Sequence, residues 1–265
     1  MPRAALAALA AWLLLLAAAP LVAPHPYQEQ YRDAPNAPAS RRFPLGTDPL
    51  GRDRLSRMLF GARLSLACAP AAAALSGFLA LLLALAGGFG GRPAERTVAM
   101  LADLFLSLPW LFALVAARAA LPLDAPPAAA VAVTFGLLGG LGWAGPCRIL
   151  MAAVARHRQA EFVLAAEAAG CARWRIAAVH VTPHLWKLAA AQFLVTVPAF
   201  LLAEANLGLL GLGVPEPLAS LGGMLRDLED LASIVQHPLV LAPALLLIAL
   251  AGLFHCAVSA DESQV

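Results

Sequence analysis

The residues of this sequence that could carry out chemistry are few, and their spacing excludes several kinds of catalytic site. The chain has one lysine, Lys187, whereas a phosphate-binding P-loop needs a lysine directly after its glycine-rich turn. The glycine cluster at 87–91 has no lysine nearby and is typical of a tight turn at a helix end. The sequence also contains no HExxH zinc motif and no two-aspartate motif. We therefore expect no nucleotide-hydrolysing site, no cofactor and no catalytic residue, which disfavours an intramembrane enzyme.

The four cysteines do not form a recognisable redox or metal-binding pattern. No CxxC spacing is present, and no histidines stand at ligand-like distances from them. We interpret them as reduced, buried small hydrophobic residues, and we predict neither a disulfide framework nor a metal site. These residues are Cys68, Cys147, Cys171 and Cys256.

One charged segment stands out in an otherwise apolar chain: residues 161–184, which read EFVLAAEAAGCARWRIAAVHVTPH. Residues 160–169 are good helix formers, and Gly170 suits a left-handed stop at the helix end. Helical spacing places Phe162, Ala165, Ala166 and Ala169 on one side. A helix of about ten residues is marginal in water and needs a surface to pack against. The segment is therefore either a solvated helix between membrane spans or a docking helix for a soluble partner.

The composition places this docking candidate in a membrane protein. Hydrophobic residues make up 61% of the 265 residues and charged residues 13%, against about 45–50% and about 25% in soluble domains. The net charge of +2 does not favour a nucleic-acid partner. We predict an all-α polytopic protein in the lipid bilayer, with six spans long enough to cross it. They are residues 4–23, 64–88, 97–121, 126–147, 185–209 and 237–258.

The loops between these spans do not fix the orientation of the chain. We expect the first span to remain uncleaved, because Pro20 and Pro24 make a poor signal-peptide cleavage site. With six spans, both termini share one face with the polar segment 148–187, and the segments 24–63 and 208–236 share the other. Lys and Arg are nearly equal in number on the two faces, so the positive-inside rule leaves the orientation open.

Four segments, taken in order, resemble the integral permease subunits of bacterial ABC importers, in the dipeptide, oligopeptide and nickel branch. The helix and stop at 161–170 resemble the EAA loop of that family, and the segment EFVLAAEAAG continues to HVTPH at 180–184. Residues 44–66, PLGTDPLGRDRLSRMLFGARLSL, resemble the segment after the first span. Trp143 and Arg148 match a tryptophan and an arginine of the branch. The fourth segment, residues 204–225, resembles a glutamate followed by a glycine-rich turn.

The resemblance implies a fold, an orientation and a set of partners. The fold would be that of a type I ABC-importer permease, in the bacterial inner (plasma) membrane with both termini cytoplasmic. Residues 1–63 would form the first span and an extracytoplasmic segment. Residues 64–258 would form a five-helix core with a cytoplasmic coupling loop at 148–187, and residues 259–265 a short tail. The partners would be two ATP-binding subunits, a second and different permease, and an extracytoplasmic solute-binding protein, with ATP hydrolysed on the separate subunits.

The resemblance also assigns an ATPase-coupling role to part of the charged segment. The coupling residues would be Glu161, Phe162, Ala165, Ala166, Gly170 and Pro183. The sequence departs from the family pattern at Leu164, where the EAA motif begins with a glutamate, and in the C-terminal residues after the last span. These departures weaken any inference about the substrate.

Two acidic residues within the spans require an explanation, because a charge inside the bilayer is costly. Asp103 would line the pathway or act as a hydrogen-bonding anchor inside the bundle, or would pair with Arg96 near the cytoplasmic end of its span. We favour the pairing with Arg96. Trp143 and Arg148 are further candidate pathway or structural residues. Glu204 would line the translocation path or hold the following turn by accepting backbone N–H bonds, and the sequence does not decide between these roles.

The leading hypothesis is a permease subunit of an ATP-driven importer for short peptides. Nickel or metal-chelate uptake is the alternative within the branch. An ion-gradient-driven secondary transporter is the alternative from another class. We disfavour it because we find no convincing internal repeat and because such a protein does not need a large docking loop.

Overall fold

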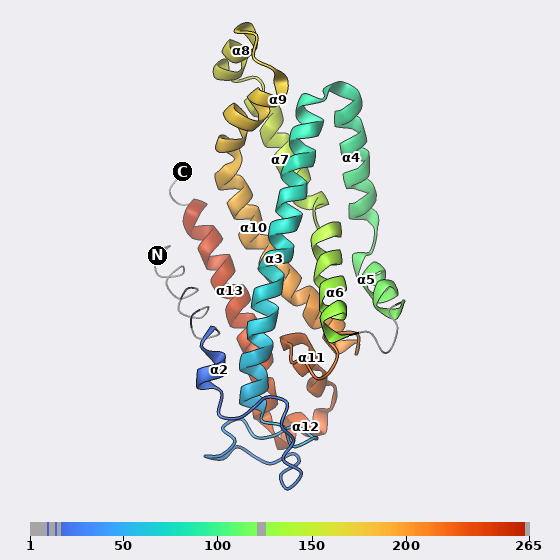
Figure 1. Cartoon of the computed structure of the whole chain (residues 1–265), viewed down its shortest axis with the longest axis vertical. Helices are drawn as coiled ribbons and strands as arrows, with labels where there is room; N and C mark the ends of the chain where they lie inside the picture. Colours follow the sequence, from blue (N-terminus) through green and yellow to red (C-terminus); the bar gives the residue numbers. More distant parts are fainter. Residues whose placement is uncertain (1–9, 11–13, 15–16, 121–125, 263–265) are drawn as a thin grey trace. The chain divides into compact units, whose positions relative to one another are not determined.

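The computed structural model describes residues 10, 14, 17–120 and 126–262, and every named element within these ranges is a helix (Figure 1). The predicted all-α class is therefore confirmed. Four helical stretches are long and apolar enough to cross a membrane, and up to five if one bent pair counts as a single span. The first predicted span, 4–23, lies largely outside the described residues, and only α2 (Ala19–Val22) represents its end.

The four long stretches correspond to four of the predicted spans. The first is α3 (Arg54–Phe89). The second combines α6 (Pro127–Leu141) with α7 (Ala144–His157). The third combines α9 (Arg173–Arg175), the π-helix η1 (Ile176–Val181) and α10 (Thr182–Leu209). The fourth combines the 3-10 helix η3 (Pro238–Leu241) with most of α13 (Ala242–Glu262).

The remaining predicted span, 97–121, is broken. It consists of α4 (Gly91–Ser107) and α5 (Trp110–Ala119), whose axes differ by 78°. Pro109 stands at the break, and Leu108 before it adopts an extended conformation with ψ 128°. A residue before proline is pushed out of the helical region by the proline ring, so the break follows from the local sequence.

The polar segment 148–187 is mostly helical rather than a loop. Helix α7 continues to His157, and helical structure resumes at Arg173 and runs into α10. Only the stretch between them, which contains α8 (Glu161–Ala168), departs from these two long helices.

The chain divides into two compact units. The first comprises residues 1–70, 115–134 and 197–265. Its helices include the start of α3, the end of α10, and α11 (Leu221–Leu225), which packs on α13. The 3-10 helix η2 (Arg226–Glu229) and α12 (Leu231–Gln236) follow α11. This unit also contains the irregular segment before α3, which is folded by its own hydrogen bonds, such as those from Tyr31 N–H to the Gly51 carbonyl and from Thr47 N–H to the Ala37 carbonyl.

The second unit comprises residues 71–114 and 135–196, and its core is built largely from small side chains. Helix α4 packs on α7 in this unit. The buried cluster contains alanines as well as larger residues. Small residues let helix backbones approach closely inside a bilayer, where the hydrophobic effect does not drive helices together. The larger cluster members include Trp143, Phe89, Leu150, Ile176 and Leu185, and its alanines include Ala80, Ala84, Ala102 and Ala153.

Candidate functional site

Helix α8 is a short helix with a well-defined end. It starts after Ala160, which is extended, and the predicted stop at Gly170 is confirmed by its φ of +77°. Gly170 N–H donates to the Glu167 carbonyl at 2.9 Å, and Cys171 N–H donates to the Ala166 carbonyl at 3.0 Å. This is the Schellman arrangement, which satisfies the last carbonyls of the helix and turns the chain away. The sequence therefore fixes the length of α8 locally.

One side of α8 packs on its own chain. Val163 and Ala166 are buried, at 0% and 9% exposure, whereas Ala165 and Ala169 are exposed. Of the residues that helical spacing groups on one side, Ala166 therefore meets the core, whereas Ala165 and Ala169 are exposed. The directions of the flanking α7 and α10 segments decide which side of α8 meets the core.

Phe162 connects α8 to the two long helices that flank it in the second unit. Its ring stacks on His184 with centroids 4.8 Å apart and an interplanar angle of 18°, and it lies 6.4 Å from the His157 ring. His157 is the last residue of α7, and His184 is in the first turn of α10. The three rings thus join α8 to both long helices, and Pro183 lies exposed beside His184.

The opposite face of α8 is exposed within the part of the chain that the structure describes. Leu164 is 52% exposed, and Ala165, Glu161 and Glu167 are also exposed. Shortly after α8, Trp174 is 73% exposed, and Arg173 and Arg175 beside it are exposed as well. Figure 1 shows α8 beyond the ends of α7 and α9. Leu164 of α8 and Trp174 of α9 are both more than half exposed, so an apolar and aromatic surface is accessible here.

Asp103 pairs with Arg148 and not with the predicted Arg96. The carboxylate and the guanidinium form an ion pair, with the Asp103 and Arg148 side chains 58% and 46% exposed. The packing of α4 on α7 places these residues opposite each other, whereas Arg96 lies two turns away on the same helix. Trp143 is buried, and its ring lies 5.2 Å from Phe105. Asp103, Trp143 and Arg148 therefore belong to one contact region between α4 and α7.

Glu204 is buried at the end of α10 in the first unit, where it is 1% exposed. Its Oε2 accepts bonds from the Ser65 hydroxyl and the Gly222 N–H, both at 3.2 Å. This contact is the turn-holding one of the two roles considered above. The surrounding backbone is tightly packed, since a Cβ on Gly208 would lie 2.1 Å from the Gly222 backbone.

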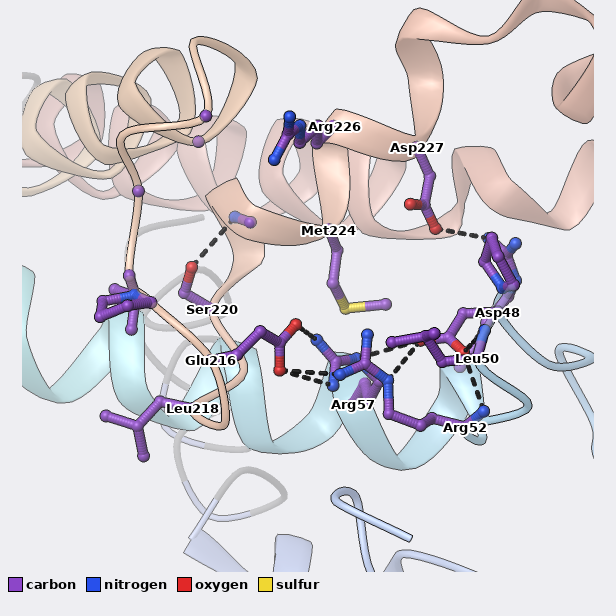
Figure 2. Close-up of a pocket in the computed structure, with 18 residues that line it drawn as sticks. Asp48, Leu50, Arg52, Arg57, Glu216, Leu218, Ser220, Met224, Arg226 and Asp227 are labelled. Carbon is purple, nitrogen blue, oxygen red and sulfur yellow. Dashed lines mark hydrogen bonds and ion pairs between the residues drawn. The ribbon is translucent and has the colours of Figure 1, made fainter. Parts of the chain in front are cut away.

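The structure also reveals a charged cluster that we did not single out as a site from the sequence. Glu216 accepts from Arg52 Nη1 at 2.7 Å and from Arg57 Nη2 at 2.9 Å. Arg54 pairs with Asp227 at 3.0 Å. Figure 2 shows these side chains around one cavity of about 370 Å³. In the sequence, the only indication of this cluster was the group of Asp and Arg residues at 48–57 in an otherwise apolar chain. The acidic partners of these arginines, such as Glu216, lie more than 150 residues later.

The electrostatics of this cluster follow from burial and pairing. Burial lowers the pKa of the Arg52 guanidinium. The hydrogen bond and charge of Asp48, together with Glu216, outweigh this effect, so the pKa of Arg52 is raised above its ordinary value. Burial raises the pKa of the Asp227 carboxyl, and the charge of Arg54 only partly opposes this. Among the described residues, no group of three His, Cys, Asp or Glu side chains could hold a metal ion.

The helical architecture and its apolar spans define a polytopic membrane protein, and comparison with known proteins identifies its family. Residues 65–260 match the family described as binding-protein-dependent transport system inner membrane component. The chain belongs to this family. It is therefore a multi-pass permease component of an inner membrane.

Several relatives support this assignment. The chain is 30% identical over 208 residues to the dipeptide transport system permease protein DppC of Bacillus subtilis, covering 78% of this chain and 63% of the relative. It is 34% identical over 218 residues to the di/tripeptide transport system permease protein DppC of Pseudomonas aeruginosa, covering 80% and 70%. It is 34% identical over 253 residues to the oligopeptide transport system permease protein OppC of Mycobacterium tuberculosis, covering 93% and 84%.

Proposed function

We propose that this chain is the membrane-spanning permease subunit of an ATP-driven importer for short peptides. The substrate class rests on the relatives, which are named for dipeptides, di- and tripeptides and oligopeptides. The partners are two ATP-binding subunits, a second homologous permease and an extracytoplasmic solute-binding protein. Residues 1–63, the core 64–258 and the tail 259–265 take the places described above, with both termini cytoplasmic.

The observation that carries the coupling part of this proposal is the two-sided character of α8. Its inner side is anchored by Val163, Ala166 and Phe162, whereas Leu164 and Ala165 on its outer side are exposed in the part of the chain that the structure describes. An ATP-binding subunit binds this outer side of α8. The small side chains of α8 allow the two surfaces to approach closely. Glu161 at the helix start and Gly170 at its end define the part of the loop that docks.

The same contacts provide a route for movement. Phe162 packs on His157 at the end of α7 and on His184 at the start of α10, so a displacement of α8 acts on both long helices. Closure of the ATP-binding subunits would then shift the membrane helices between two arrangements, which is how a distant ligand biases a bistable element. The packed contacts of Phe162, His157 and His184 carry this movement. They are therefore as important for coupling as the outer side of α8 that docks.

The test is uptake by the complete transporter in sealed vesicles. We expect labelled trialanine to accumulate with ATP and the solute-binding protein, and not with a non-hydrolysable ATP analogue. Accumulation driven by a proton or sodium gradient without ATP would contradict the proposal and support a secondary transporter. Replacing Phe162 with Ala should reduce uptake while ATP hydrolysis by the complex continues, because the anchored lever is lost but the ATP sites are untouched.

A further inference from the structure

The charged cavity of the first unit has an unbalanced set of side chains. It is lined by four arginines, Arg52, Arg54, Arg57 and Arg226, and by three carboxylates, Asp48, Glu216 and Asp227. One positive charge is therefore left over within the cavity. A site with this balance attracts a single additional negative charge.

Two of the arginines form a receptor for a carboxylate. Arg52 Nη1 and Arg57 Nη2 donate to the two different oxygens of Glu216, at 2.7 and 2.9 Å. Guanidinium donors arranged in this way match the geometry of a carboxylate closely. The Arg52 and Arg57 side chains are only 12% and 9% exposed, whereas Glu216 is 57% exposed.

The arginines are fixed in the wall of the cavity by other contacts. Asp48 Oδ2 accepts from Arg52 Nε at 2.6 Å, and Asp48 Oδ1 accepts from the N–H groups of Leu50 and Arg52. Arg57 Nε also lies 3.8 Å from Asp48 Oδ2. Because these contacts do not involve Glu216, the two arginines keep their positions when Glu216 leaves.

Glu216 is the member of the cluster that can be replaced. It lies between the end of α10 at Leu209 and the start of α11 at Leu221, in a segment without a helix. Its side chain is more than half exposed, so water can solvate it after separation. An incoming carboxylate can exchange with it without leaving a buried charge unpaired.

Arg226 supplies the positive charge that remains. Its side chain is exposed, and no acidic partner for it is found among the described residues. In Figure 2 it lies apart from the Arg52, Arg57 and Glu216 group, with Met224 between them. Leu50, Val214, Leu218 and Met224 provide apolar wall for the rest of a ligand.

We propose that this cavity binds the carboxylate of a small solute, held by Arg52 and Arg57 in place of Glu216, with Arg226 balancing the added charge. If the proposed function holds, the solute is a peptide and the group is its C-terminal carboxylate. A cavity of about 370 Å³ lies at the lower end of the range for small-molecule sites, which favours a small solute over a protein surface. Glu216 then acts as the resident competitor that the solute displaces.

The test measures binding of trialanine and of trialanine amide to the complete membrane complex in phosphatidylcholine nanodiscs, without the solute-binding protein. Phosphatidylcholine carries no net charge, so no anionic lipid competes. We expect trialanine to bind about tenfold more tightly than its amide, as a charge-assisted hydrogen-bonded pair would give. Glu216→Gln should tighten binding of trialanine several-fold and leave the amide unchanged, because the competitor loses its charge.

Two variants test the arginines. Arg57→Gln should abolish the preference for the free carboxylate, and Arg226→Gln should weaken it several-fold with little risk to folding, since Arg226 is exposed. Arg63→Gln serves as the control, because Arg63 is an exposed arginine of α3 outside the cavity. Equal affinity for trialanine and its amide in both the unmodified and the Glu216→Gln complexes would overturn the proposal.

A third result separates this proposal from its alternatives. If Arg57→Gln weakens docking of the solute-binding protein but leaves trialanine binding unchanged, the cluster recognises a protein and the solute site is refuted. ATP-driven uptake of labelled trialanine is measured alongside. Normal uptake without any carboxylate preference would refute only the solute site, whereas absent uptake with a clear preference would refute only the proposed function.

Discussion

The turn after α10 and the helix α8 both contain small residues, but these residues have different surroundings in the two regions. Around the turn, Glu204 satisfies Ser65 and Gly222, and the backbones of Gly208 and Gly222 are in close contact. At α8, one side packs on the chain, and Leu164 and Ala165 on the other side are exposed. The turn is held by contacts within the chain, whereas one side of α8 is exposed. Small residues are packed against the chain itself in the first region and are exposed in the second, where the proposed function places the ATP-binding subunit.

The largest effect that separates the two regions is expected from adding a methyl group at Gly208. A Cβ there lies 2.1 Å from the Gly222 backbone, so Gly208→Ala forces the turn away from α10. We expect a loss of about 1–3 kcal/mol in the free energy of unfolding, measured by thermal unfolding in detergent. Gly140→Ala is the matched control, because its Cβ meets nothing within 4 Å and should stabilise α6 by up to about 1 kcal/mol. Equal effects of the two substitutions would contradict the close packing.

An effect of similar size is expected at Glu204. Glu204→Ala leaves the Gly222 N–H and the Ser65 hydroxyl without their shared acceptor in a buried place. An unsatisfied buried group costs about 1–3 kcal/mol, so the thermal midpoint should fall clearly. Glu204→Gln keeps an acceptor oxygen and should lose less than half as much. If alanine and glutamine behave alike, the acceptor contacts do not hold the turn.

At Gly170 we expect a modest loss of stability together with a loss of function. Gly170→Val places a β-branched residue at a φ of +77°, where the side chain crowds the backbone, at a cost of about 1–2 kcal/mol. Co-purification of the ATP-binding subunit should fall in parallel, because the end of α8 shifts. Gly170→Asn tolerates the left-handed conformation better and should retain most of the co-purification. Full co-purification with valine would show that the helix end is not needed for docking.

The smallest effect is expected for the ion pair between Asp103 and Arg148. Both side chains are about half exposed, and exposed pairs contribute about 0.2–1 kcal/mol. A double-mutant cycle with Asp103→Asn and Arg148→Gln should therefore give a coupling energy in this range, measured from thermal unfolding. A much larger coupling energy would mean that the pair lies away from water, at a protein or lipid interface.

The sequence predicts where the helices of this fold lie along the chain better than it predicts which residues contact one another. Spans are recognisable because apolar length is a local property, and the end of α8 follows from Gly170. The partner of Asp103 was not predictable, since the spacing along the chain favours Arg96 and only the packing of α4 on α7 brings Arg148 to it.

The faces and partners of the candidate sites depend on the same tertiary information. Val163 and not Ala165 is buried, because the directions of α7 and α10 decide which side of α8 meets the core. The pairing of Arg57 with Glu216 joins residues 159 positions apart, and neither residue type alone indicates a partner. Local sequence signals therefore indicated the helix α8 but not which of its sides meets the core, and they did not indicate the charged cavity.

The most direct test of the central claim is the affinity between the ATP-binding subunit and the membrane complex carrying Ala165→Glu. Ala165 is exposed on the free side of α8, so the substitution should leave the thermal midpoint unchanged and weaken binding at least about tenfold, by placing a charge in an apolar contact. Ala39→Glu, at an exposed alanine of the other unit, should change neither quantity. If Ala165→Glu binds the ATP-binding subunit as tightly as the unmodified chain does, α8 is not the docking element.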